Sequence, residues 1–235
     1  MNTVKIKRGR KRSYHHGDLK RQLIAAAEEL ILERGVDGFT LREAARRAGV
    51  SPAAPAHHFG DAEGLLAEVA YLGFKEFGDA LAAADERGGK DPHMRLIEQG
   101  LAYVQFALGN PARFELMFRH SKVDFSKHPA LATAGERSFR ILEDAIRAAT
   151  GTPAGAPLSP DASGYLMAIW SIVHGFSHLA LGGELDNPAR RAGGGRKAIL
   201  STFLPLALRY LPRPVLSGEK NAGGVTRRAA RRPPP

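Results

Sequence analysis

Residues 40–59 read Thr-Leu-Arg-Glu-Ala-Ala-Arg-Arg-Ala-Gly-Val-Ser-Pro-Ala-Ala-Pro-Ala-His-His-Phe, the pattern of two short helices joined by a tight turn. Thr40 can cap the first helix through its hydroxyl, and Glu43, three residues later, can reach back to complete a capping box. Gly49 is expected to end this helix, because glycine accepts the left-handed conformation that such an end requires.

The second helix is predicted to begin directly after this turn. Ser51 is placed to cap it, with Pro52 at the first helical position, where a missing N–H costs nothing. Pro55 then falls at the fourth position, where it removes an N–H that is only just needed. A helix, a glycine turn and a second helix are typical of the helix-turn-helix, which places its second helix in the major groove of DNA.

The flanking segments predict a small three-helix domain over residues 17–62. Apolar residues recur at helical spacing over 17–34 and indicate an amphipathic helix that ends at Arg34-Gly35. They are Leu19, Leu23, Ala26, Ala27, Leu30 and Ile31. Phe39 can close the core of this domain, and Asp61 can cap a further helix that carries Leu65, Leu66 and Val69.

The stretch from Tyr14 to Leu66 resembles the N-terminal domain of the TetR (tetracycline-repressor-like) family of transcription regulators. The matching pieces, in order, are Ala26-Ala27, Leu30-Ile31, Gly35-Val36-Asp37-Gly38-Phe39-Thr40, Ala45, Ala48-Gly49-Val50-Ser51, His58-Phe59 and Glu63-Gly64-Leu65-Leu66. The resemblance implies an all-α protein. Its helix-turn-helix domain over 17–62 would be followed by a helical effector-binding and dimerisation domain over 63–212.

The expected DNA-binding surface consists of the exposed positions of the two short helices. We assign to it Thr40, Arg42, Ser51, Pro52, Ala53, His57 and His58. Thr40 and Arg42 begin a helix, where free N–H groups and the helix dipole favour phosphate. Ala53 offers a methyl group to a thymine methyl, and His57 can donate to a base acceptor.

Two positions depart from the family pattern. The family usually has a Tyr two residues before the His-Phe pair, where this chain has Ala56, and a Lys before Glu63, where it has Ala62. In the family both residues commonly contact DNA phosphates. Because phosphate contacts supply much of the affinity for DNA, we expect weaker phosphate anchoring here.

Charge is concentrated at the two ends of the chain. The net charge is +10: residues 1–21 hold eight Lys or Arg and one acidic residue, and residues 213–235 hold six and one, which leaves −2 for residues 22–212. We predict a basic disordered arm over 1–16 that favours DNA, and a basic, Pro-rich disordered tail over 213–235 of open role. Without cysteine, a signal segment or an apolar run of membrane-spanning length, the chain is expected to be cytoplasmic, with no membrane partner.

Helical patterns continue through the rest of the chain without useful strand alternation. We predict a loop over 151–160, a flexible connection between the glycine clusters at 182–183 and 193–195, and helices over 61–84, 91–108, 111–119, 129–149, 161–181 and 196–210. Pro205 is expected to bend or divide the last helix. The last two helices are too apolar for a solvent-facing end of a chain, which, with the family resemblance, predicts a homodimer.

The segment from Trp170 to Gly175 resembles a Trp-x-x-x-His-Gly motif found in one branch of TetR-like ligand domains. It implies a cavity for a small-molecule effector, for which the candidate lining residues are Phe114, Met117, Phe118, Trp170, His174 and His178. Helical spacing makes the same residues ordinary core positions. His174 and His178 lie four apart, as metal-binding pairs do, but no third ligand is evident, so neither a metal nor another cofactor is predicted.

The sequence contains no nucleophile elbow, phosphate-binding loop or metalloprotease motif, and an enzyme is not expected. The predicted function is a ligand-responsive transcription regulator, a repressor that a small-molecule effector releases from a palindromic operator on double-stranded DNA. The alternative is a non-regulatory nucleoid-type or small-molecule-binding protein with weakened DNA readout. Ala56, Ala62 and the basic ends motivate that alternative.

Overall fold

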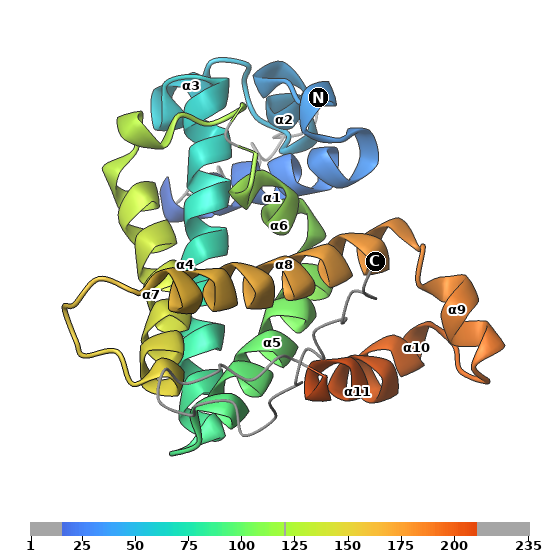
Figure 1. Cartoon of the computed structure of the whole chain (residues 1–235). Coiled ribbons are helices and arrows are strands. Elements are labelled where there is room, and N and C mark those ends of the chain that lie inside the picture. The colour runs from blue at the N-terminus through green and yellow to red at the C-terminus, as the bar shows by residue number, and fades with distance from the viewer. Residues whose placement is uncertain (1–15, 120, 211–235) are drawn as a thin grey trace, which may run out of the picture.

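The computed structural model describes residues 16–119 and 121–210. These residues form helices joined by connections, and none of them lies in a strand, which confirms the all-α fold class. Figure 1 shows the helix-turn-helix at one end of the long helix α4, α5 and α7 beside the rest of α4, and α9 to α11 farther from it. The predicted basic arm, apart from His16, and the predicted tail lie outside the described residues.

The N-terminal helices pack as the three-helix pattern predicts. They are α1 (His16–Arg34), α2 (Leu41–Arg47) and α3 (Ala54–Phe59), with the 3-10 turn η1 (Val36–Gly38) between α1 and α2. Leu23 and Leu30 of α1 and Ala44 of α2 are fully buried, and Phe39 is 9% exposed. Burial of these apolar side chains holds the short helices α2 and α3, which are too short to be stable alone.

Helix α4 (Ala62–Gly88) belongs to both parts of the molecule. Its first turn is capped by Asp61, whose Oδ1 accepts a hydrogen bond from the Gly64 N–H at 2.8 Å. It contacts α1 and α3 of the N-terminal domain and also α5, α6 and α7. A movement of α4 would therefore also move the helices of the helix-turn-helix domain that contact it.

The second part of the molecule surrounds helix α5. Its elements up to residue 182 are α5 (Pro92–Gly109), α6 (Pro111–Met117), the 3-10 turn η2 (Phe125–Lys127), α7 (Pro129–Thr150) and α8 (Pro160–Gly182). Each of the four α-helices has a proline in its first turn, where the missing N–H has no intrahelical partner to lose. Helices α4, α7 and α8 all contact α5, so that the cluster has a continuous apolar core.

The C-terminal segment corrects one expectation and confirms another. The connection predicted as flexible contains a short helix, α9 (Asp186–Arg191), whose Ala189 is buried against Ala180 and Ile199. The last predicted helix is divided into α10 (Arg196–Ala198), the π-helical turn η3 (Ile199–Phe203) and α11 (Leu204–Arg209). Pro205 lies in the first turn of α11, and its missing N–H explains the division.

Helix α8 presents apolar side chains outward. It is long and apolar enough to span a membrane, yet it packs against α5 and α7, and about a third of its most apolar stretch is buried. Its exposed side includes Met167, Ile172 and Leu179, which are 63%, 40% and 48% exposed. An apolar face of this kind on a helix that is packed on the core is typical of a surface covered by a partner.

Candidate nucleic-acid interface and internal cavity

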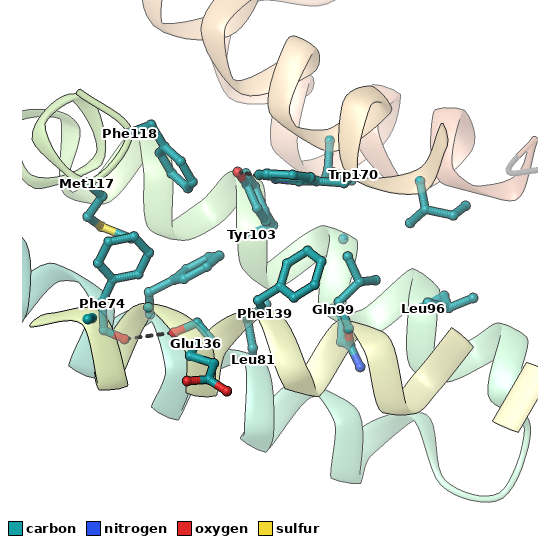
Figure 2. Close-up of a pocket in the computed structure, with 18 of the residues that line it drawn as sticks. Phe74, Leu81, Leu96, Gln99, Tyr103, Met117, Phe118, Glu136, Phe139 and Trp170 are labelled. Carbon is teal, nitrogen blue, oxygen red and sulfur yellow. Dashed lines mark hydrogen bonds between the residues drawn. The ribbon is translucent and has the colours of Figure 1, made fainter. Parts of the chain in front are cut away.

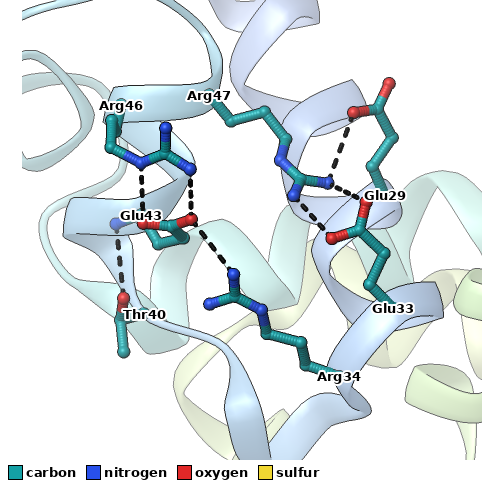
Figure 3. Close-up of polar contacts among 7 residues, drawn as sticks. All are labelled: Glu29, Glu33, Arg34, Thr40, Glu43, Arg46 and Arg47. Atoms are coloured by element: carbon teal, nitrogen blue, oxygen red, sulfur yellow. Dashed lines mark hydrogen bonds and ion pairs between the residues drawn. The ribbon is translucent and has the colours of Figure 1, made fainter.

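The first helix of the helix-turn-helix begins where the sequence predicts. The Thr40 hydroxyl accepts a hydrogen bond from the Glu43 N–H at 3.3 Å. The reciprocal half of the capping box is wrong, because the Glu43 carboxylate instead accepts hydrogen bonds from Arg46 at 2.6 and 3.0 Å and from Arg34 at 3.4 Å (Figure 3). These guanidinium groups hold the carboxylate in its charged form, and the Arg46 hydrogen bond lowers the pKa of Glu43 to about 2.

A second ion-pair cluster fixes α2 on α1. Both Nη atoms of Arg47 donate to the Glu33 carboxylate, at 2.6 and 2.7 Å, and Glu29 lies 3.5 Å from Arg47 (Figure 3). Arg46 and Arg47 are thus engaged in holding the domain together. Arg42 is exposed and forms no ion pair within the described residues, so it remains available to a phosphate.

The turn and the second helix differ in part from the prediction. Gly49 has a φ of 67°, the left-handed conformation expected of it. Ser51 does not cap the second helix: its carbonyl accepts from the Ala54 N–H at 3.0 Å, and α3 begins at Ala54 with Ala53 at the N-cap. The two prolines explain the shift, because this start places Pro55 in the first turn, where no intrahelical hydrogen bond is lost.

The residues that we assign to DNA binding are mostly exposed. Six of them are exposed, and His58 is half-buried; the exposed ones are Thr40, Arg42, Ser51, Pro52, Ala53 and His57. The His58 ring lies 6.3 Å from the Phe59 ring and 5.4 Å from the His57 ring, measured between centroids. Ala56 is also exposed. The surface is therefore accessible and carries small and imidazole side chains.

The second part of the molecule contains an apolar cavity of about 360 Å³ that is partly open to the surface, within the range of about 300–1,000 Å³ that is typical of ligand pockets. Its walls come from α4, α5, α6, η2, α7 and α8. Figure 2 shows Phe74, Met117 and Phe118 at one end, Gln99 and Leu96 at the other, and Tyr103, Phe139 and Trp170 between them. Glu136 is the lining residue that carries a charge, and it is exposed and bonded to Arg140 at 2.6 Å.

Three of the six candidate effector residues line this cavity: Met117, Phe118 and Trp170. Phe114 is fully buried and packs against the Phe118 ring at 5.2 Å. His174 is half-buried and His178 is exposed, and the cavity lining does not include them. Sequence reasoning missed Phe74, Gln99, Tyr103 and Phe139, because their helical spacing is that of core residues and carries no separate signal.

A hydrogen-bonded chain leads from the cavity wall to the two histidines. The Trp170 Nε1–H donates to the Tyr103 hydroxyl oxygen at 3.4 Å, and this hydroxyl lies 2.7 Å from His174 Nδ1. His174 Nε2 lies in turn 3.2 Å from His178 Nε2. Burial raises the pKa of Tyr103, while burial and then the charge of His178 lower the pKa of His174. These hydrogen-bonded side chains are therefore uncharged where they meet the cavity.

The histidine pair remains a two-residue arrangement. Within residues 16–119 and 121–210, no group of three or more His, Cys, Asp or Glu side chains is placed to hold a metal ion. Two imidazoles supply fewer ligands than a structural or catalytic zinc requires. Their contacts with Tyr103, Phe118 and each other account for their positions.

Helix α6 connects the cavity to the N-terminal domain. Its Met117 lines the cavity, and its Arg113, 17% exposed, donates to Glu28 of α1 and pairs with Glu76 of α4 at 2.6 Å. Beyond α6, Lys122 pairs at 2.5 Å with Asp37. These contacts tie one cavity wall to α1 and to the turn that precedes the helix-turn-helix.

Comparison with known proteins assigns both parts of the chain to one family. Residues 23–69 match the family model described as bacterial regulatory proteins, tetR family. Residues 96–194 match the model described as the Tetracyclin repressor-like, C-terminal domain. The first matched segment contains the helix-turn-helix, and the second contains most of the helices around the cavity.

Among curated relatives, the HTH-type transcriptional regulator BetI 1 of Chromohalobacter salexigens is 37% identical over 83 residues, 34% of this chain and 41% of the relative. The uncharacterised HTH-type transcriptional regulator YobS of Bacillus subtilis is 29% identical over 100 residues, 42% of this chain and 51% of the relative. The chain thus spans about half or less of the length of these relatives.

Solved structures match over most of the chain. A protein of unknown function from Rhodococcus sp. RHA1 is 33% identical, with a TM-score of 0.64, and the match covers 86% of this chain and 99% of that one. The TetR family transcriptional regulator PfmR from Thermus thermophilus is 22% identical, with a TM-score of 0.59 and coverage of 82% and 96%. At this identity, the match to PfmR shows a similar fold and nothing more.

Proposed function

Because this chain belongs to the TetR family of transcription regulators, we propose that it is a ligand-responsive, DNA-binding regulator in the cytoplasm. Specifically, we propose a homodimeric repressor that leaves a palindromic operator when a small molecule occupies the cavity. The exposed surface of α2 and α3 supplies the DNA contacts, and the cavity between α4 and α8 supplies the effector site.

The observation that carries this proposal is the double role of α6. Met117 and Phe118 meet the cavity, and Arg113, one turn earlier, holds Glu28 of α1 and Glu76 of α4. An occupant that displaces the cavity end of α6 therefore acts on the helix against which α2 is packed. A ligand changes DNA affinity only by binding the two arrangements differently, and this wall is where the arrangements can differ.

The dimer converts a small movement into a loss of affinity. In a two-fold complex the two recognition helices must enter major grooves about 34–36 Å apart, one helical turn of DNA. Helix α4 begins directly after α3 and extends along the cavity, so a shift of α4 changes that separation. The apolar outer face of α8 is the surface by which two copies would join.

The first test is DNA specificity. Sites are selected from a random DNA library with the full chain, and binding to the selected duplex and to random duplex is followed by fluorescence anisotropy across a salt series. A specific regulator binds its site about 10³-fold or more tightly than random DNA at physiological salt. A ratio near one would contradict the proposal and favour the nucleoid-type alternative.

The second test addresses coupling through Arg113. A thermal-shift screen of small molecules identifies compounds that stabilise the protein, and each is then added to the protein–DNA complex. We expect the compounds that bind in the cavity to release the DNA, and Arg113→Met to bind the same compounds while releasing DNA less. Arg87→Met, which breaks a peripheral pair with Glu98 at 3.2 Å, is the matched control and should release DNA normally. Equal release in both variants would remove α6 from the mechanism.

A further inference from the structure

The chemistry of the cavity wall restricts what it can bind. Neither Lys, Arg nor His is among the residues that line it, and its single carboxylate, Glu136, is exposed and bonded to Arg140. A carboxylate or phosphate group on a ligand would lose its water inside and gain no cation in return. A buried ammonium group would equally lack a free carboxylate. Burying a charge without a partner is strongly unfavourable, so the wall favours an uncharged ligand.

The interior is built mainly from aromatic rings on several elements. Pairs of rings meet edge to face: Phe77 and Tyr103 at 5.0 Å, and Phe139 and Trp170 at 5.8 Å between centroids. Because aromatic rings prefer offset or edge-to-face neighbours, a flat ring placed between them continues the same arrangement. The wall therefore suits a ligand with an aromatic ring better than a flexible chain of the same volume.

One buried polar atom of a lining residue has no hydrogen-bond partner among the residues that the structure describes. Gln99 is 4% exposed, and its Nε2 donates to Asp85 Oδ1 at 2.7 Å, while its buried Oε1 accepts no hydrogen bond. Asp85 is held in turn by Arg95 at 2.7 Å, which fixes the orientation of the amide because a flipped amide would set its oxygen against the carboxylate. A buried acceptor left unpaired is costly, and a ligand that reaches it with an O–H or N–H removes that cost.

We propose that the cavity binds an uncharged, mainly aromatic molecule that carries one hydrogen-bond donor, and that Gln99 Oε1 accepts the hydrogen bond from this donor. A phenol is the simplest molecule of this class. The inference rests on the proposed function only in taking the cavity to be the effector site. Tyr103 is a weaker candidate for the acceptor, because its hydroxyl already contacts both Trp170 and His174.

The test uses four probes of one shape and the intrinsic fluorescence of Trp170, which is the chain's single tryptophan and lies on the cavity wall. The probes are para-butylphenol, its methyl ether para-butylanisole, the anion para-butylbenzoate and the cation para-butylbenzylammonium. We expect the phenol to bind at least about tenfold more tightly than either ion. It should bind about threefold to tenfold more tightly than the ether. An ion that binds as well as the phenol, or no binding by any probe, overturns the proposal.

Variants locate the site and the acceptor. Gly135→Leu should block the cavity, because a Cβ at Gly135 meets the Phe74 ring at 3.7 Å and a larger side chain extends beyond it. Gly135→Ala is the matched control that retains binding. The preference for phenol over ether should disappear in Gln99→Met and persist in Tyr103→Phe, with circular dichroism confirming the fold of each. The reverse result, or phenol binding to Gly135→Leu, contradicts the assignment.

These measurements are made without DNA, so that their outcome is separate from that of the proposed function. A phenol that binds with the expected preferences but leaves the protein on DNA would support the ligand class and contradict effector-driven release. Release of the DNA by a charged compound that does not compete with the phenol would support effector-driven release and contradict the proposed class of effector.

Discussion

Ala56 of α3 stands where the TetR family usually has a tyrosine. It is exposed on α3, so that a tyrosine hydroxyl there would be accessible to a DNA phosphate. We expect Ala56→Tyr to tighten binding to the selected duplex by about 0.5–1.5 kcal/mol, the net value of one added hydrogen bond. Anisotropy titration at fixed salt measures the change. Ala56→Phe, which adds the ring without the hydroxyl, serves as the control and should gain less.

Ala62 allows the same restoration at the first residue of α4, where it is half-buried. Ala62→Lys should tighten binding by a similar amount and make it more dependent on salt, since each added phosphate contact steepens the salt slope by about 0.9. If neither substitution improves affinity, the approach of this helix-turn-helix to DNA differs from that of its relatives.

His174 makes the stability of the protein depend on pH. Burial, and after it the charge of His178, lowers its pKa below the ordinary value of 6.5. The folded protein therefore binds a proton on His174 less readily than the unfolded chain. Unfolding takes up protons once the pH falls to about 6.5, so this contribution to stability is complete above that value and lost as the pH falls toward the folded pKa.

The corresponding measurement is urea denaturation of the wild type and His174→Gln at pH 7.5 and pH 5.5, at one protein concentration. We expect the wild type to lose more stability between the two pH values than the variant does, because titrating groups that do not contact His174 contribute equally to both and His178 no longer has a charged neighbour in the variant. An equal loss would show that protonation of His174 is not linked to folding.

Residue-level patterns predict caps and core far better than they predict the cavity. Thr40, Asp61 and Gly49 could be assigned from sequence because a cap or a left-handed turn depends on neighbours a few residues away. Whether Phe74 or Phe114 faces an open space depends on how five helices fit together. Both have the spacing of core residues, and only the packed structure separates the lining residue from the buried one.

At the scale of elements, the long periodic helices and the short helices α2 and α6 are predicted within a few residues, whereas the short helix α9 is not. Helices α4, α5, α7 and α8 each repeat their apolar stripe over many turns, which fixes them locally. The six residues of α9 contain Pro188 and lie between glycine clusters, so their pattern resembles a loop. Ala189 holds this helix in place through contacts with Ala180 of α8 and Ile199 of η3, which lie outside the short segment whose pattern is read.

The α4–α5 hairpin depends on Gly88. A Cβ at this position would lie 2.3 Å from the Arg95 Cα, so an alanine would push the two helices apart. We expect Gly88→Ala to destabilise the protein by about 1–3 kcal/mol, the usual result of overpacking. Thermal unfolding followed by circular dichroism gives the comparison. Gly109→Ala, at the end of α5 with nothing within 4 Å of the added carbon, should be neutral or slightly stabilising.

At the scale of the whole molecule, we expect the outward face of α8 to determine the oligomeric state. Ile172 and Leu179 lie two turns apart on one side of α8 and are 40% and 48% exposed, and Leu206 of α11 is 47% exposed. A single chain has no described element that covers them. Complete transfer of such a side chain out of water is worth about 1.5–3 kcal/mol, so burial of these half-exposed side chains against a second copy contributes part of that value from each chain.

We therefore expect the wild type to sediment as a dimer at micromolar concentration, and Ile172→Glu/Leu179→Glu to sediment as a 25.3 kDa monomer with its helical content retained. Leu32→Glu is the matched control, because Leu32 of α1 is 59% exposed but lies in the helix-turn-helix domain, away from α8. It should remain dimeric.

The monomeric variant should also lose affinity for the selected palindromic duplex far more than for a half-site, because the second recognition helix is no longer joined to the first. A wild type that sediments as a monomer, or a double variant that stays dimeric, would place the interface elsewhere and remove α8 from the proposed route between effector and DNA.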